Sequence, residues 1–170
     1  MSSCTIALDV MGGDGAPDSI VAGAIRAARE LPHDIVLVGI ESQVESALKH
    51  YKRRPLNIRI EHAAEVIGMH ESPAASVRKK RQASVSVAAR LVKAGKADAI
   101  VSAGNTGAAV VAATLHMGLL ERVDRPGIAV LLPTPRGITV LIDAGANIAP
   151  SAEQLQQYAI LGSAYAQYMC

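Results

Sequence analysis

Short apolar runs alternate with longer amphipathic stretches along most of this chain, so strands and helices are predicted in turn. The apolar runs predict strands at residues 5–10, 34–39, 57–61, 98–102, 128–132 and 137–143. Helical spacing predicts helices at about residues 17–30, 42–51, 84–94, 108–120 and from 151 to the end. Strands that alternate with helices favour an α/β fold with a mostly parallel sheet covered by helices on both faces, a three-layer α-β-α arrangement.

Local signals predict where several of these elements begin and end. Pro17 suits a first helical position, and Gly95 suits the end of the helix that precedes it. Ser42 with Glu45, and Ser151 with Gln154, have the spacing of capping boxes. The last two strands flank the turn PTPRG, which favours an antiparallel hairpin. Residues 62–76 predict a functional loop or short helical turns, because Glu71-Ser-Pro73 interrupts any longer helix.

Composition narrows the class of protein without identifying a ligand. The chain has 170 residues, half of them apolar, and contains neither Trp nor Phe, so one domain with a core of Val, Ile, Leu and Ala is expected. A net charge of +2 gives no argument for nucleic acid. The two cysteines form neither a disulfide framework nor a metal cluster, and no basic segment precedes the first apolar run. A reducing cytoplasm is therefore the expected compartment.

The stretch of residues 99–120 contains no charged side chain and joins an apolar run, the loop SAGNTG and an Ala-rich helix. A long uncharged run is a membrane-span candidate, but Gly104, Asn105, Thr106 and His116 interrupt it. The loop is consistent with a simple capped turn. It also suits an anion, because glycines admit a ligand to the backbone and free N–H groups begin the next helix. Ser102, with Asn105 and Thr106, adds side-chain donors.

Three small-residue loops, MGGDGAP, SAGNTG and DAGAN, directly follow predicted strands. In parallel sheets, ligands bind beyond the carboxyl ends of the strands, so this shared position favours a ligand site. Asp9, Asp14 and Asp143 lie in or next to these loops, where a carboxylate can orient a ligand, bind a metal or hold loop N–H groups. Gly12 and Gly13 allow the backbone of the first loop to turn tightly.

Other chemical signals are weaker or absent. His70, beside Glu71, is a candidate proton-transfer group, although an isolated loop histidine is more often a surface residue. The run Arg78-Lys-Lys-Arg81 suits a solvated helix face, a phosphate or an acidic protein partner. No dinucleotide fingerprint, Walker loop or zinc motif occurs, so no metal or cofactor is implied.

Several ordered motifs resemble those of one family. Residues 9–17 (DVMGGDGAP) resemble the opening signature of the bacterial phosphate acyltransferases of phospholipid synthesis, the PlsX family. The resemblance continues through Glu71-Ser-Pro73, Arg78-Lys-Lys80, residues 101–108 (VSAGNTGA) and Asp143-Ala-Gly-Ala-Asn147. Family members are considerably longer, so the chain is similar to the amino-terminal part of a longer fold. The resemblance implies a fold like that of isopropylmalate dehydrogenases and phosphotransacetylases.

The resemblance implies transfer of a fatty acyl group from acyl carrier protein to inorganic phosphate, without a redox cofactor or metal. It further implies a homodimer in the full-length form and peripheral association with the cytoplasmic membrane. The candidate catalytic residues are Asp9, Asp14 and His70. The candidate phosphate- or substrate-binding residues are Gly12, Gly13, Arg78, Lys80, Ser102, Gly104, Asn105, Thr106, Gly107, Asp143 and Asn147. Lys79 and Arg81 are the candidate docking contacts for the acidic carrier protein.

Two other functions fit the same residues. A short-chain phosphate acyltransferase would take the acetyl or butyryl group from an acyl-coenzyme A donor. A fragment without the second half of the family fold would act only as a phosphate- or partner-binding module. Competition between the two thioester donors separates the first alternative, and phosphate affinity without turnover would favour the second.

Overall fold

The computed structural model describes residues 3–145 and 147–169, which form parts of two compact units divided after Gly118. The expectation of a single domain stays a prediction. The elements of the first unit are β1 (Thr5–Asp9), α1 (Asp18–Glu30), β2 (Asp34–Gly39), α2 (Glu41–Leu48), β3 (Ile58–His62), α3 (Pro73–Lys79), α4 (Ser84–Lys93), β4 (Ala99–Ser102) and α5 (Thr106–Met117). Those of the second are β5 (Ala129–Thr134), β6 (Gly137–Ile142) and α6 (Ala152–Met169).

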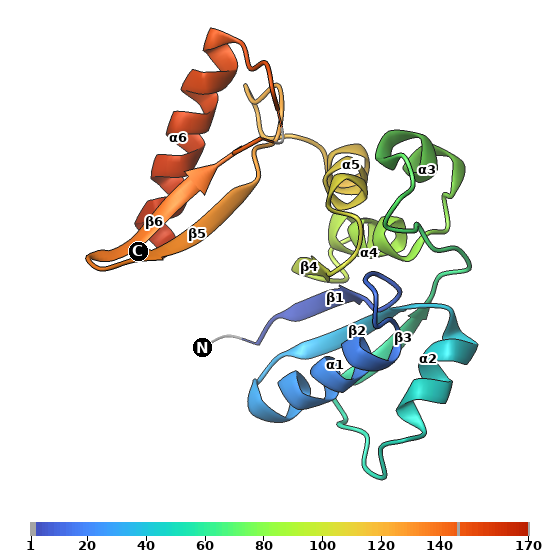
Figure 1. The fold of residues 1–170 in the computed structure, drawn as a ribbon. Helices are drawn as coiled ribbons and strands as arrows, with labels where there is room; N and C mark the ends of the chain where they lie inside the picture. The colour runs from blue at the N-terminus through green and yellow to red at the C-terminus, as the bar shows by residue number, and fades with distance from the viewer. Residues whose placement is uncertain (1–2, 146, 170) are drawn as a thin grey trace. The chain divides into compact units, whose positions relative to one another are not determined.

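A four-stranded sheet in the order β3-β2-β1-β4 forms the centre of the first unit (Figure 1). All three strand pairs are parallel, as the alternating pattern predicts. The register places Asp9, the last residue of β1, beside Ser102, the last residue of β4. The loops that follow β1 and β4 are about ninety residues apart in sequence, and they therefore lie side by side at the carboxyl ends of the strands.

Helices cover both faces of this sheet, which confirms the three-layer arrangement (Figure 1). On one face, apolar side chains of α1 and α2, among them Val21, Ile25 and Val44, bury the sheet residue Leu37. On the other face, α4 packs on β1 and β2. The helices α3 and α5 then pack on one another, and α5 also packs on α4, around a third cluster that includes Val77 and Ala108.

The second unit consists of an antiparallel hairpin of β5 and β6 and the helix α6, which packs on β6. The predicted hairpin is therefore confirmed. Both hydrogen bonds of the predicted capping box are present at the start of α6: the Gln154 N–H donates to Ser151 Oγ at 3.2 Å, and the Ser151 N–H donates to Gln154 Oε1 at 3.1 Å. Each satisfies a backbone donor that the helix itself leaves free.

Three boundary predictions need correction. The capping box at Ser42 is wrong, because α2 begins one residue earlier, after Ile40, and has no side-chain cap. Pro17 is the cap residue of α1 rather than its first helical residue. The predicted loop of residues 62–76 ends at Ser72, because Pro73 begins α3, where a proline at the first helical position loses no hydrogen bond; no helix crosses Glu71-Ser-Pro73, as predicted. None of the helices among the described residues is both long and apolar enough to cross a membrane.

Candidate functional site

The loops after β1 and β4 are joined by a buried carboxylate. Asp9 is 4% exposed, and Ser102 Oγ donates to its Oδ2 at 2.7 Å. The Met11 N–H donates to Asp9 Oδ1 at 3.2 Å, while the Gly104 N–H donates to Ser102 Oγ at 3.1 Å. A buried carboxylate is costly unless it accepts hydrogen bonds, so these contacts hold the two loops in one geometry. The sequence leaves three roles open for Asp9: to orient a ligand, to bind a metal or to hold loop N–H groups. The observed contacts match the third role.

Glycines allow the two loops to lie in direct backbone contact. A Cβ atom on Gly12 would lie 2.7 Å from the Gly104 nitrogen and 2.9 Å from Asp9 Oδ2. Gly13 has a φ of +100°, a conformation that side chains disfavour, and its Cβ would lie 3.0 Å from the Ala103 carbonyl oxygen. The sequence therefore needs glycine at these positions for shape as well as for any ligand.

Asn105 connects the SAGNTG loop to the loop before α3. Its Oδ1 accepts from the Ala108 N–H at 3.0 Å, so Asn105 caps the start of α5, as the capped-turn interpretation predicts. Its Nδ2 donates to the carbonyl oxygens of Met69 and Glu71, each at 3.1 Å. The Asn105 side chain is therefore engaged in holding the segment 68–71 against the start of α5.

Glu71 and Lys80 form an ion pair in this same segment, with Lys80 Nζ 2.6 Å from Glu71 Oε1. The Gly68 N–H and Ser76 Oγ also donate to the Glu71 carboxylate, and Lys80 donates to the Val66 carbonyl. The Gly68 N–H contributes most, then Lys80 and Ser76, to lowering the pKa of Glu71 from 4.5 to about 2. Lys80, which the sequence suggests as a phosphate ligand, is thus paired with a carboxylate.

The start of α5 offers unpartnered donors. Within residues 3–145 and 147–169, the backbone N–H groups of Thr106 and Gly107 have no hydrogen-bond partner, and the side chain of Thr106 is exposed. Gly107 packs closely on α3, since a Cβ there would lie 2.6 Å from Pro73 Cγ. Between the loops, a cavity of about 10 Å³ is lined by residues that include Asp9, Ser102 and Asn105. It has the volume of about one water molecule, so a phosphate would have to bind outside it.

The other predicted residues of the first unit do not all gather here. Asp14 is exposed in the loop after β1, and His70 is exposed in the segment that Asn105 holds. Arg78 and Arg81 line a separate groove between α3, α4 and α5, and Lys79 is exposed at the last position of α3. The structure therefore joins His70 to the loop site through its segment, and places Arg78 and Arg81 on another surface.

Asp143 and Asn147 belong to the second unit. Asp143 follows β6 with a φ of +54°, and its N–H donates to the Ile128 carbonyl at 2.7 Å. Its Oδ2 is buried without a hydrogen-bond partner among the described residues. Asn147 Nδ2 donates to Gln154 Oε1 at 3.1 Å, which connects the loop to the capping box of α6.

The sequence does not identify every side chain that organises these surfaces. Glu71 is not among the candidate site residues, although it accepts hydrogen bonds from three residues. Arg90 and His116 line the same groove as Arg81. Nothing in the spacing marks them, since their proximity depends on how α4 and α5 cross.

Among the described residues, no three His, Cys, Asp or Glu side chains are grouped so that they could hold a metal ion.

The chain matches a known protein family over nearly its whole length. A family described as fatty acid synthesis protein matches residues 4–170. The phosphate acyltransferase of Gloeothece citriformis is 45% identical over 170 residues, covering 99% of this chain and 48% of that protein. The phosphate acyltransferase of Heliobacterium modesticaldum is 50% identical over 163 residues, covering 95% of this chain and 49% of that protein. The chain thus spans about half the length of these curated relatives, and the resemblance seen in the motifs is confirmed.

A solved structure is similar in fold. A phosphotransacetylase from Streptococcus pyogenes superposes with a TM-score of 0.67 at 21% identity, covering 93% of this chain and 52% of that chain. At this identity the likeness supports the fold alone. It confirms the expected similarity to phosphotransacetylases in architecture.

Proposed function

This chain belongs to the fatty acid synthesis protein family, and we propose that it forms the amino-terminal half of an enzyme that transfers a fatty acyl group from acyl carrier protein to inorganic phosphate. The product would be an acyl phosphate, the activated acyl donor for phospholipid synthesis. The curated relatives carry the name phosphate acyltransferase, which supports the acceptor and the reaction type.

The observation that carries the proposal is the contact between the loops after β1 and β4. The backbones of Gly12 and Gly104 lie so close together that a side chain on Gly12 would clash. The hydrogen bond from Ser102 to Asp9 holds the two loops in this position. Unpartnered N–H groups of Thr106 and Gly107 lie at the start of α5, beside these loops. Preorganised backbone donors at a helix start suit a phosphate oxygen, because they carry partial positive charge and need no rearrangement.

The reaction itself requires positioning and charge stabilisation. A phosphate oxygen attacks the carbonyl carbon of the thioester, and the carbonyl oxygen becomes an oxyanion. The C–S bond then breaks, the new C–O bond to phosphate remains, and the proton lost by phosphate ends on the carrier thiol. No protein nucleophile is needed, so the protein contributes by holding phosphate near the acyl carbon and stabilising the oxyanion.

Proton transfer and donor recognition would come from exposed side chains. His70 and Asp14 are the candidates for the proton, since both are solvent-accessible in segments held at the site, whereas Asp9 is occupied by hydrogen bonds. The exposed cations Lys79 and Arg81 would dock the acidic carrier protein. We further propose that the full-length form is a cytoplasmic homodimer that associates peripherally with the membrane.

A second candidate is transfer between phosphate and a short-chain acyl-coenzyme A. The fold likeness to a phosphotransacetylase is compatible with this reaction. The two candidates differ in the donor, so they are separated by which thioester is consumed.

The test uses the 170-residue chain and a chimaera in which this chain replaces the matched half of the Gloeothece citriformis relative. Each is incubated with fatty acyl carrier protein or with acetyl-coenzyme A, with and without phosphate, and the released thiol is measured. We expect the chimaera to release carrier thiol only when phosphate is present. Preferential use of acetyl-coenzyme A would favour the short-chain enzyme. A folded chimaera that consumes neither donor would contradict the proposal, and phosphate binding without turnover would then favour a binding module.

A further inference from the structure

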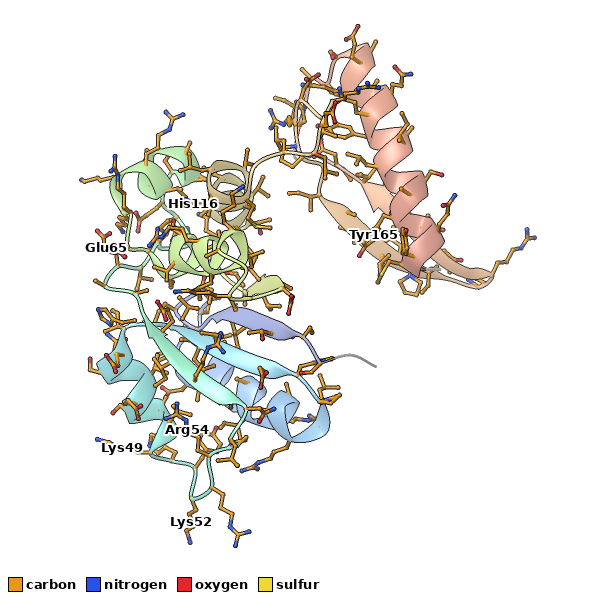
Figure 2. All side chains as sticks on the ribbon, turned by 180° about the vertical axis from the view of Figure 1, so that it is seen from behind. Lys49, Lys52, Arg54, Glu65, His116 and Tyr165 are labelled. Atoms are coloured by element: carbon orange, nitrogen blue, oxygen red, sulfur yellow. The ribbon has the colours of Figure 1, made fainter. Side chains whose placement is uncertain are left out.

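A groove lies on the first unit between α3, α4 and the carboxyl end of α5, away from the loops described above. Its volume is about 690 Å³, within the range of sites for small organic ligands. The lining includes Arg78, Arg81 and Arg90, together with Leu115 and His116. Figure 2 shows His116 on α5, the helix that packs on α4.

The groove is cationic and its charges are uncompensated. Arg78 and Arg81 have side chains with no hydrogen-bond or ion-pair partner within the described parts of the chain, and no carboxylate lines the groove. Arg90 is held in place, because its Nη1 donates to the Arg81 carbonyl at 2.7 Å and its Nη2 to Gln82 Oε1 at 3.2 Å. Three guanidinium groups on one concave surface, one of them fixed, favour a ligand with more than one negative charge.

One wall of the groove is apolar or neutral. Leu115 is 56% exposed, a large apolar side chain that water covers in the free protein. Burial, with a smaller contribution from Arg90, lowers the pKa of His116, so its ring is neutral near pH 7. The volume also far exceeds that of a phosphate ion, so a ligand that fills the groove needs an organic part to contact this wall.

We propose that this groove binds an organic phosphate monoester, with the phosphate on the guanidinium groups of Arg78, Arg81 and Arg90 and the organic part against Leu115. A phosphate group offers oxygens that match the planar guanidinium fork, and it is nearly dianionic at neutral pH. The inference goes beyond the proposed acyl transfer, because neither Asp9 nor Ser102 lines the groove; the groove shares only Arg81 with the proposed carrier-protein docking contacts.

The test measures binding of n-butyl phosphate to the 170-residue chain by isothermal titration calorimetry at pH 7.5, with inorganic phosphate and 1-butanol as separate probes. We expect n-butyl phosphate to bind more tightly than inorganic phosphate, and 1-butanol not to bind. Arg78→Gln and Arg81→Gln should each weaken n-butyl phosphate binding about tenfold, the loss expected when one charge-assisted contact is removed. Leu115→Ser should weaken binding of n-butyl phosphate while leaving that of inorganic phosphate unchanged.

Arg53→Gln is the matched control, since Arg53 is an exposed arginine in the loop after α2, next to Lys52 in the sequence. It should leave the affinity within about twofold of the original. The proposal fails if n-butyl phosphate does not bind, if Arg53→Gln weakens binding as much as Arg81→Gln, or if inorganic phosphate binds equally tightly. Because the side chains of Arg78 and Arg81 have no partners, their replacement should leave the circular dichroism spectrum unchanged. No thioester enters this experiment, so its failure would leave the proposed acyl transfer untouched.

Discussion

Asn105→Ala removes the side chain that connects the start of α5 to the segment before α3. Loss of the helix cap, which accepts from the Ala108 N–H, costs about 1 kcal/mol. The carbonyl groups of Met69 and Glu71 also lose their Nδ2 donor, each worth about 1 kcal/mol. We therefore expect the free energy of unfolding of the first unit to fall by about 3 kcal/mol, the sum of the cap and the two carbonyl contacts.

Urea unfolding measures the total loss in free energy of unfolding. Amide hydrogen exchange followed by mass spectrometry shows where the structure is loosened, and we expect faster exchange in peptides that cover residues 66–72 and 105–112. Asn105→Asp keeps the cap acceptor but removes the Nδ2 donors, so it should increase exchange in the first peptide more than in the second. Thr106→Ala is the control, because the exposed Thr106 side chain has no partner in the described structure. A loss below about 0.5 kcal/mol for Asn105→Ala, half of a single cap, would refute this account of the contact.

Three further contacts are tested by substitution, two of them with a matched control. Because the folded-state pKa of Glu71 is lowered from 4.5 to about 2, its ionised form stabilises the fold above about pH 4.5, and this stabilisation is lost as the pH falls towards 2. Glu71→Gln should therefore be less stable than the original at pH 6 in urea titrations, and a difference that persists at pH 2 would contradict this. Gly12→Ala should lower the melting temperature, because the added Cβ atom clashes at a cost of about 1 to 3 kcal/mol. Gly23→Ala is the control and should raise the melting temperature slightly, because its Cβ atom would meet no atom within 4 Å. Equal changes in melting temperature for the two variants would contradict this. Ser151→Ala should destabilise α6 by about 1 kcal/mol in hydrogen exchange, while Ser42→Ala, at a position without a cap bond, should not.

Most of the architecture was predictable because each element has a local signal. The apolar residues 35–38 of β2 and the amphipathic spacing of α1 indicate their types, and alternation of strands and helices implies the parallel sheet that is observed. The two capping boxes show the limit of such signals. Their side-chain pattern is equivalent, yet only the box at Ser151 forms, because α2 begins before Ser42.

The site was predictable in part. The sequence predicts that the loops after β1 and β4 lie at the carboxyl ends of their strands, and the two loops are in contact because those strands are neighbours. The role of Lys80 depends on a contact with Glu71 between the two ends of α3, and that of Arg78 on the crossing of α3, α4 and α5. Such contacts leave no periodic signal in the sequence, so a basic run alone could not distinguish a structural ion pair from a binding surface.

The central claim is that phosphate, and not water, receives the acyl group. The most direct measurement is a ³¹P nuclear magnetic resonance spectrum of the chimaera incubated with fatty acyl carrier protein and inorganic phosphate. The account predicts a new acyl phosphate resonance that grows in step with free carrier thiol and is absent from the chimaera that carries Gly12→Ala. Release of thiol together with free fatty acid, and no new phosphorus resonance, would contradict it.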